Sequence, residues 1–230
     1  MQYIEKNSNN DVFVQIGTND GNDLFRNIVY KLKPRVVILI EPNNQLYTTI
    51  KENYRDIESN VIIINKCIYD KDDEEVSLFI PAKNGIYGNP GEQPERVLGN
   101  YTYNTQHFSL IPMNDWGKKT DMVEIKSKTI TFNTLCKLHD ITHINYLQID
   151  TEGYDSQIIS SIDFSKIKID ILRYEKWPFN ENCFSKYHDE NKHIYGINGM
   201  KNVEKLLLSY NYKLYDIQDT DGDDIIAIKQ

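Results

Sequence analysis

Short apolar runs alternate with amphipathic segments along the first half of the chain. Three runs rich in branched residues are flanked by turn residues, as expected of strands buried on both faces of a sheet: Val12–Ile16, Val36–Ile40 and Val61–Ile64. Between them, Leu24–Leu32 and Asn44–Tyr54 carry apolar residues three and four positions apart, the spacing of a helix with one buried face. This alternation of strands and helices predicts a parallel sheet.

A long irregular segment interrupts the alternation. Glu75–Ile80 has the pattern of a further strand, but from Pro81 to about Met122 the period is lost, and Gly, Asn, Pro and aromatic residues dominate. Loops of this length in compact domains are usually functional covers of a site, so we expect a substrate lid at about residues 81–122. The alternative is a disordered surface loop.

Regular elements resume at Thr131. The predicted helices and strands are, in order, the helix Thr131–Leu138, the strand Ile144–Ile149, the helix Ser156–Ile162, the strand Ile167–Tyr174 and the helix Val203–Tyr210. Two strands follow, Lys213–Ile217 and Ile225–Ile228. The turn between them, Asp219–Asp224, is too short for a parallel crossover, so this pair is predicted to be an antiparallel C-terminal hairpin.

Composition restricts the class of protein. A chain of 230 residues with 40% hydrophobic residues fits one domain, residues 1–230, with a single core. Its net charge of −8 repels phosphate backbones and anionic lipid, which argues against a nucleic-acid partner. No membrane-spanning run and no leader pattern is evident, so a cytoplasmic location is expected, and the oligomeric state cannot be predicted.

The first candidate site is the turn that follows Val12–Ile16. Gly17 ends this strand and Gly21 lies four residues on, which lets the backbone approach a ligand closely at the carboxyl end of the strand. Glu41 ends the next strand about 20 residues later, where a carboxylate can accept hydrogen bonds from both hydroxyls of a ribose. Together they predict a nucleoside site, whereas the glycine spacing alone fits an ordinary tight turn.

Two acids near this turn bear on the choice of cofactor. The spacing of Gly17 and Gly21 differs from the glycine pattern that holds the pyrophosphate of a dinucleotide. In addition, the negative charges of Asp20 and Asp23 would repel a pyrophosphate. They suit a cofactor that carries an ammonium and a sulfonium. The alternative is that Asp20 and Asp23 simply cap the start of the following helix.

A second acidic cluster follows the strand Ile144–Ile149. Asp150 and Glu152 should reach the same sheet edge as Gly17, because the first and fourth strands of such a sheet adjoin at the switch point where ligands bind. A third acid, Glu175, ends the next strand. The alternatives are that the first two cap the following helix and that Glu175 makes a structural ion pair.

The chain resembles the FkbM family of methyltransferases over about residues 11 to 178. The resemblance rests on the segments VQIGTNDG, LIEPNNQLY, KCIYD, KTITFNTLC, YLQIDTEGYDSQII and ILRYEKWPF, of which IDTEGYD is the most specific. It implies a class I, Rossmann-like, doubly wound sheet of seven strands. It also implies S-adenosylmethionine as cofactor and O-methylation of hydroxyls on sugars or small metabolites.

The resemblance also implies roles for individual residues. Carried over by position, those that border the cofactor are Gly17, Asn19, Gly21 and Asp150 at the methionine part, Glu41 at the ribose, and Tyr69 and Asp70 near the adenine. Gln15 departs from the pattern, because methyltransferases generally place Asp or Glu there to hold the ammonium through bound water. The contact of Gln15 with the ammonium is therefore expected to be weaker.

Methyl transfer to a hydroxyl requires alignment and a group that takes the proton. A carboxylate or imidazole within hydrogen-bond reach can do so, and the candidates are Glu152, His107 and Glu175. The alternative for His107 is a solvated loop histidine. Asp150, Glu152 and Glu175 could instead hold a divalent cation, an interpretation that we do not favour. Two other functions stay open: a catalytically silent cofactor-binding or scaffold protein, and an NAD-dependent sugar-modifying enzyme.

Overall fold

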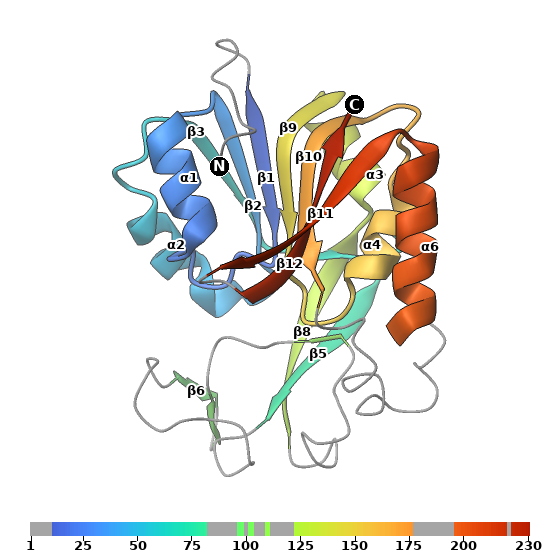
Figure 1. Ribbon diagram of the computed structural model, residues 1–230. Coiled ribbons are helices and arrows are strands. Elements are labelled where there is room, and N and C mark those ends of the chain that lie inside the picture. Colours follow the sequence, from blue (N-terminus) through green and yellow to red (C-terminus); the bar gives the residue numbers. More distant parts are fainter. Residues whose placement is uncertain are drawn as a thin grey trace.

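The computed structural model describes residues 11–81, 96–98, 101–103, 109–110, 122–176, 196–219 and 222–230. Its centre is a seven-stranded sheet (Figure 1). The strands of this sheet, in chain order, are β1 (Val12–Ile16), β2 (Val36–Ile40), β3 (Asn60–Ile64), β9 (His143–Ile149), β10 (Lys168–Glu175), β11 (Tyr212–Asp219) and β12 (Gly222–Lys229).

Five strands of this sheet run parallel, and two form the C-terminal hairpin. The order across the sheet is β11-β12-β10-β9-β1-β2-β3. β1 pairs in parallel with both β2 and β9, whereas β12 is antiparallel to β10 and to β11. After β1 the chain adds β2 and β3 on one side of the sheet, and after β9 it adds β10 and the hairpin on the other side. The predicted doubly wound sheet with an antiparallel hairpin is confirmed, and the switch point lies between β1 and β9.

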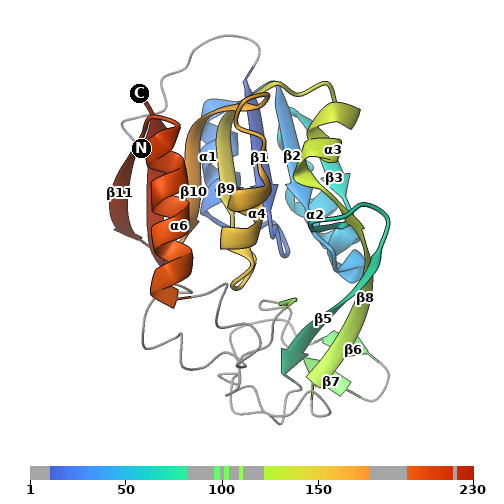
Figure 2. The same cartoon turned by 90° about the vertical axis from the view of Figure 1, so that its right-hand side faces the viewer.

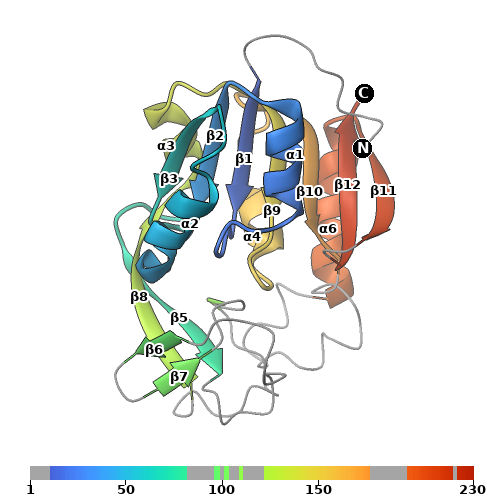
Figure 3. The same ribbon diagram turned by 90° about the vertical axis from the view of Figure 1, so that its left-hand side faces the viewer.

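Helices cover both faces of the sheet. On one face lie α1 (Leu24–Leu32), the short 3-10 helix η1 (Asn44–Leu46) and α2 (Tyr47–Asn53) (Figure 3). On the other lie α3 (Phe132–Leu138), α4 (Asp155–Ser161) and α6 (Gly196–Ser209) (Figure 2). None of the described helices is long and apolar enough to cross a bilayer.

The alternation of side chains along β1 shows how the layers join. Phe13 points to the first face, where its ring lies 6.5 Å from that of Phe25 in α1. Val14 points to the other face and belongs to the core cluster that contains Phe132 of α3 and Ile158 of α4. Because both faces are covered by helices, β1 is buried along its whole length, as its apolar run predicted.

A smaller sheet projects beyond the carboxyl ends of the parallel strands (Figures 1 and 2). It consists of β4 (Cys67–Ile68), β8 (Met122–Ile130) and β5 (Glu75–Pro81), in that order. β5 and β8 form a long antiparallel ribbon. Two further short strands, β6 (Arg96–Leu98) and β7 (Tyr101–Tyr103), pair with each other.

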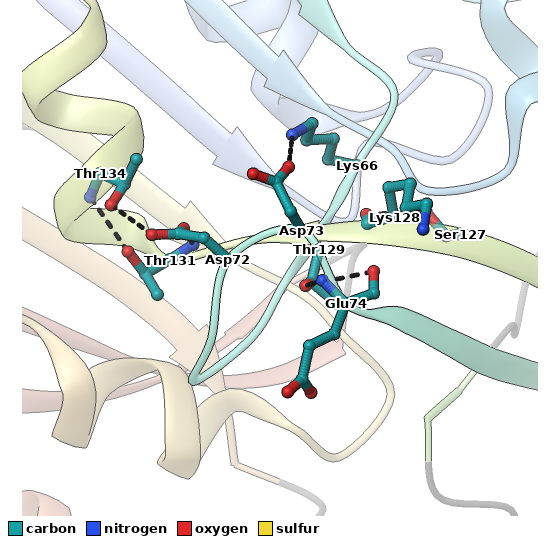
Figure 4. Close-up of polar contacts among 9 residues, drawn as sticks. All are labelled: Lys66, Asp72, Asp73, Glu74, Ser127, Lys128, Thr129, Thr131 and Thr134. Carbon is teal, nitrogen blue, oxygen red and sulfur yellow. Dashed lines mark hydrogen bonds and ion pairs between the residues drawn. The ribbon is translucent and has the colours of Figure 1, made fainter.

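Hydrogen bonds in the turn between β4 and β5 fix this smaller sheet to the main body (Figure 4). The carboxylate of Asp72 accepts the backbone N–H of Thr131 at 2.6 Å and the hydroxyl of Thr134 at 2.7 Å, so the turn is tied to the start of α3. The N–H of Glu74 donates to the hydroxyl of Thr129 in β8 at 2.9 Å. The turn between β4 and β5 is therefore bonded both to the start of α3 and to β8.

Three sequence predictions need correction. No strand was predicted between Met122 and Ile130, yet β8 occupies this range. The strand was not predicted because two of its buried positions hold the polar residues Ser127 and Thr129, so the sequence does not alternate between apolar and polar residues there. The last helix was predicted from Val203 but begins at Gly196. The hairpin strands extend further into the predicted turn Asp219–Asp224 than its polar residues suggested. Most of the insertion 81–122 lies outside the described residues.

Candidate active site

The turn after β1 brings two strand ends into close contact. Gly17 has a φ of +82°, and its N–H donates to the carbonyl of Ile40 at 3.0 Å. A Cβ atom at Gly17 would lie 1.6 Å from the carbonyl oxygen of Asp150 at the end of β9. Position 17 therefore requires glycine both for its backbone angle and for the close approach of the two strands.

Gly21 packs against an aromatic side chain, and its predicted contact with the cofactor stays a prediction. Its φ is +74°, and a Cβ atom there would meet the ring of Tyr54 at 2.9 Å. Its N–H closes the turn by donating to the carbonyl of Thr18 at 2.9 Å. Gly21 thus leaves room for an aromatic side chain and is not part of the pocket lining, whereas Gly17 is.

Glu41 is a buried carboxylate held by two backbone amides. One oxygen, Oε2, accepts the N–H of Asn19 at 2.8 Å, and the other, Oε1, accepts the N–H of Asn43 at 2.8 Å. The side chain is only 5% exposed. Burial raises the pKa of Glu41 to about 7, although the two amide hydrogen bonds act in the opposite direction. Glu41 therefore has a fixed orientation and remaining capacity to accept hydrogen bonds.

A pocket opens at the switch point, and its empty space, counted together with the solvent at its mouth, is about 660 Å³. Five of the predicted site residues line it: Gly17, Asn19, Glu41, Asp150 and Glu152. They come from the ends of β1, β2 and β9. The structure therefore brings together the two candidate clusters that are far apart in the sequence.

The acids at the end of β9 are buried close to one another. Burial raises the pKa of Asp150 well above its ordinary value, and the neighbouring Glu152 and Asp155 raise it further. Asp155, at the start of α4, is fully buried and accepts the hydroxyl of Thr151 at 2.5 Å. Burial raises the pKa of Asp155 to about 6, although the hydrogen bond from Thr151 lowers it. A cationic or hydroxyl-rich ligand suits such surroundings better than an anion.

Glu152 stands out by its backbone conformation. Its φ of +53° lies in the left-handed region, and Gly153 follows at +110°. A glutamate seldom adopts this conformation, and it costs about 1–2 kcal/mol relative to an ordinary one. Strain of this kind at a pocket wall is typical of residues held for function.

Gln15 and Asp23 lie next to the pocket lining but are not part of it. Gln15 is fully buried, and its side-chain amide donates to Asp23 at 2.5 Å. Asp23 also accepts the N–H of Arg26, so the predicted alternative of helix capping is correct for Asp23. Burial raises the pKa of Asp23. The Oε1 atom of Gln15 has no hydrogen-bond partner among the described residues.

The remaining predicted residues lie elsewhere. Tyr69 and Asp70 line a neighbouring hollow, in which the ring of Tyr69 stacks on that of Tyr154 at a centroid distance of 5.7 Å. Tyr154 lines both hollows. The backbone N–H of Glu175 donates to Asp155 at 3.3 Å, but Glu175 is not part of the pocket lining. His107 lies outside the described residues.

Several pocket residues were not predicted from the sequence. These are Ile16, Ile40, Pro42, Lys66, Cys67, Ile68, Leu78, Leu110, Thr151, Tyr154 and Ile158. Pro42 and Thr151 lie two residues after the ends of predicted strands, so their positions carried a usable signal. Leu78 and Leu110 belong to β5 and the insertion, and nothing in the local sequence indicates where the ribbon places them.

No metal site is evident in the part of the chain that the structure describes. No group of three or more His, Cys, Asp or Glu side chains in these ranges is arranged to hold a metal ion.

Comparison with known proteins gives one match in sequence and several in structure. A family model described as the methyltransferase FkbM domain matches residues 15–214. No curated protein sequence matches the chain. Among solved structures, the chain is similar to an O-methyltransferase from Bacillus cereus in complex with SAH, with 8% identity, 95% of this chain and 74% of that chain covered, and a TM-score of 0.48.

Two further solved structures show comparable similarity. The methyltransferase FkbM from Methylobacillus flagellatus KT has 13% identity and a TM-score of 0.47, with 96% of this chain and 44% of that chain covered. TrmK from M. capricolum, in complex with S-adenosyl-homocysteine, has 13% identity and a TM-score of 0.42, with 97% of this chain and 64% of that chain covered. The chain thus spans less than half of the FkbM structure.

Proposed function

The chain belongs to the FkbM methyltransferase family, and on this premise we propose that it methylates a hydroxyl oxygen of a sugar, a glycan or a small metabolite. Membership in the family makes the protein a methyltransferase with S-adenosylmethionine as its cofactor, which sets aside the NAD-dependent alternative. The hydroxyl acceptor is the proposed part. The observation that carries the proposal is the pocket at the switch point, whose lining includes Glu41 together with Asp150 and Glu152, the acids that follow β9.

The residues around Glu41 fit the nucleoside end of the cofactor. Both oxygens of Glu41 are oriented by backbone amides, and each retains a lone pair for a ribose hydroxyl. The side-chain oxygen of Asn19 is buried without a hydrogen-bond partner among the described residues, so it provides a further acceptor beside Glu41. We assign Glu41 and Asn19 to the ribose side of the site.

The close approach at Gly17 fits the methionine end. Gly17 and Asp150 line the same pocket as Glu41, and their contact leaves no room for a side chain at position 17. The negative surroundings of Asp150 would favour the ammonium of the cofactor. The predicted contacts of Gln15 with the ammonium and of Tyr69 and Asp70 with the adenine remain predictions.

Catalysis should come mainly from alignment and from removal of one proton. S-adenosylmethionine supplies the electrophilic methyl group. The acceptor oxygen forms a bond to this methyl group as the methyl–sulfur bond breaks, and S-adenosylhomocysteine leaves with the bonding electrons. The acceptor also loses its proton, and we assign the carboxylate of Glu152 as the base that takes it, because Glu152 lines the pocket and its backbone is held in a strained conformation. Glu175 and His107 are the other candidates for this base.

The acceptor would lie between the acids that follow β9 and the insertion. We propose that residues 1–230 form one domain and that the insertion 81–122 covers the acceptor. Leu110 of the insertion lines the pocket, which supports this arrangement. The acidic lining and the net charge of −8 favour an acceptor without phosphate groups, and thus not a nucleic acid.

A transfer assay tests the proposal. The full chain is incubated with S-adenosylmethionine carrying a labelled methyl group and with a panel of hydroxylated acceptors, including monosaccharides and oligosaccharides, and the products are analysed by mass spectrometry. We expect an O-methylated product with at least one acceptor. Binding of S-adenosylhomocysteine without turnover on any acceptor would favour the catalytically silent alternative.

Cofactor binding should depend on pH through Glu41. In the free protein the pKa of Glu41 is about 7, above the ordinary value of 4.5, so this group favours the folded state at low pH, and that contribution is lost as the pH rises through 7. Ribose hydroxyls that donate to Glu41 favour its ionised form, so binding should release a proton below pH 7. Affinity for S-adenosylhomocysteine should therefore increase between pH 6 and 8.

Calorimetry in buffers of different ionisation enthalpy measures this proton release directly. We expect release at pH 6 and a much smaller release at pH 8. A proton uptake at pH 6, or an affinity that falls as the pH rises, would contradict the assignment of Glu41 to the ribose.

A further inference from the structure

Ser109 connects the insertion to the ribbon. This residue is buried, with 1% exposure, and forms an isolated antiparallel bridge with Phe79 of β5. The N–H of Phe79 donates to the carbonyl of Ser109 at 2.9 Å, and the N–H of Ser109 donates to the carbonyl of Phe79 at 3.0 Å. The next residue, Leu110, lines the pocket.

The side chain of Ser109 makes a separate contact with the loop that follows β9. Its hydroxyl donates to the backbone carbonyl of Glu152 at 2.9 Å. Glu152 is the residue with the strained left-handed backbone, at φ +53°. Such a conformation persists only when its surroundings hold it in place, and a hydrogen bond to its own carbonyl is a direct restraint.

We propose that Ser109 is a positioning residue, which holds the loop of Glu152 in the conformation that places the Glu152 carboxylate on the pocket. A residue of the insertion, 43 positions earlier in the chain, would thereby help to form the wall of the cofactor site. This inference rests on the proposed function of the pocket, because Glu152 has a defined task only if cofactor and acceptor bind there.

The restraint should be visible in cofactor affinity, because the loop of Glu152 begins at Asp150, which we assign to the methionine end of the cofactor. If the loop leaves the left-handed conformation for part of the time, the apparent dissociation constant rises in inverse proportion to the fraction of molecules that remain competent. Ser109→Ala removes the hydroxyl and keeps both backbone hydrogen bonds to Phe79. We expect this variant to bind S-adenosylhomocysteine about 5- to 10-fold more weakly, as expected for the loss of one buried hydrogen bond.

Two further variants separate the hydroxyl from general packing. Ser109→Thr retains a hydroxyl and should bind S-adenosylhomocysteine within about twofold of the original protein. Ser77→Ala is the matched control, because Ser77 lies on the same ribbon, accepts a hydrogen bond from Lys126 and is not part of the pocket lining. It should leave the affinity unchanged. If Ser109→Ala fails to fold, Ser109→Cys replaces it. A thiol is only a weak hydrogen-bond donor, so this variant should also bind S-adenosylhomocysteine more weakly than the original protein.

Hydrogen exchange without cofactor tests Ser109 independently of the proposed function. Amides of residues 152–154 should exchange about 5- to 10-fold faster in Ser109→Ala than in the original protein and in Ser77→Ala, while amides of β1 and β2 keep their rates. Equal exchange at residues 152–154 would overturn the role of Ser109. Failure of the original protein to bind S-adenosylhomocysteine would instead overturn the proposed function. In that case the exchange rates at residues 152–154 would still show whether Ser109 restrains the loop of Glu152.

Discussion

Glu41→Ala should weaken binding of S-adenosylhomocysteine at least about 100-fold. The carboxylate of Glu41 is buried and fixed by the N–H groups of Asn19 and Asn43, so it can meet two ribose hydroxyls without reorganisation. A hydrogen bond to a charged group contributes about 1.5–3 kcal/mol, and each 1.4 kcal/mol corresponds to a factor of about ten in affinity. Isothermal titration calorimetry of the variant measures the effect.

A second ligand and a control variant show whether the ribose is the group that Glu41 holds. 5′-Methylthioadenosine contains the same ribose and lacks the amino acid part, so Glu41→Ala should weaken its binding by a similar factor. The control is Glu58→Ala, which removes an exposed carboxylate that pairs with Lys33. It should bind both ligands normally. A Glu41→Ala variant with undiminished affinity for 5′-methylthioadenosine would show that Glu41 does not bind the ribose.

Gly17→Ala should both destabilise the protein and abolish cofactor binding. The added Cβ atom would lie 1.6 Å from the carbonyl oxygen of Asp150, so the ends of β1 and β9 would have to move apart. The φ of +82° adds backbone strain for any residue with a side chain. Together these effects should lower the free energy of unfolding by about 3 kcal/mol or more, measured by urea denaturation.

Gly21→Ala is the matched comparison, because Gly21 has nearly the same backbone angle. The atom nearest to its added Cβ belongs to the ring of Tyr54, a side chain that can shift, and Gly21 does not line the pocket. Its loss of stability should therefore be smaller, and affinity for S-adenosylhomocysteine should fall much less than in Gly17→Ala. Equal losses in the two variants would mean that the contact between β1 and β9 has no special importance for the site.

The sequence predicted the elements that are buried on both faces and the residues at their ends. β1, β2 and β9 are short apolar runs with polar residues at their carboxyl ends, and a parallel sheet brings those ends to one edge. For this reason the amino-acid sequence alone was enough to place Gly17, Glu41 and Asp150 together. The choice of S-adenosylmethionine over NAD rested on the glycine spacing, the nearby acids Asp20 and Asp23, and the family resemblance together.

The rest depended on contacts between distant parts of the chain. β8 was missed because Ser127 and Thr129 replace apolar residues on its inward face. Without β8 and the ribbon there was no way to place Leu78 on the pocket, or to bring Ser109 to the loop of Glu152. The partner of Gly21 was equally hidden, because Tyr54 lies on a different element and reaches it only in the folded chain.

A structure of the protein with bound S-adenosylhomocysteine tests the central claim most directly. We predict that the ligand occupies the pocket at the switch point, with both ribose hydroxyls within hydrogen-bond distance of the Glu41 carboxylate and the amino acid part passing over Gly17 toward Asp150. A ligand bound elsewhere, or in this pocket with its ribose away from Glu41, would contradict the assignment of the site.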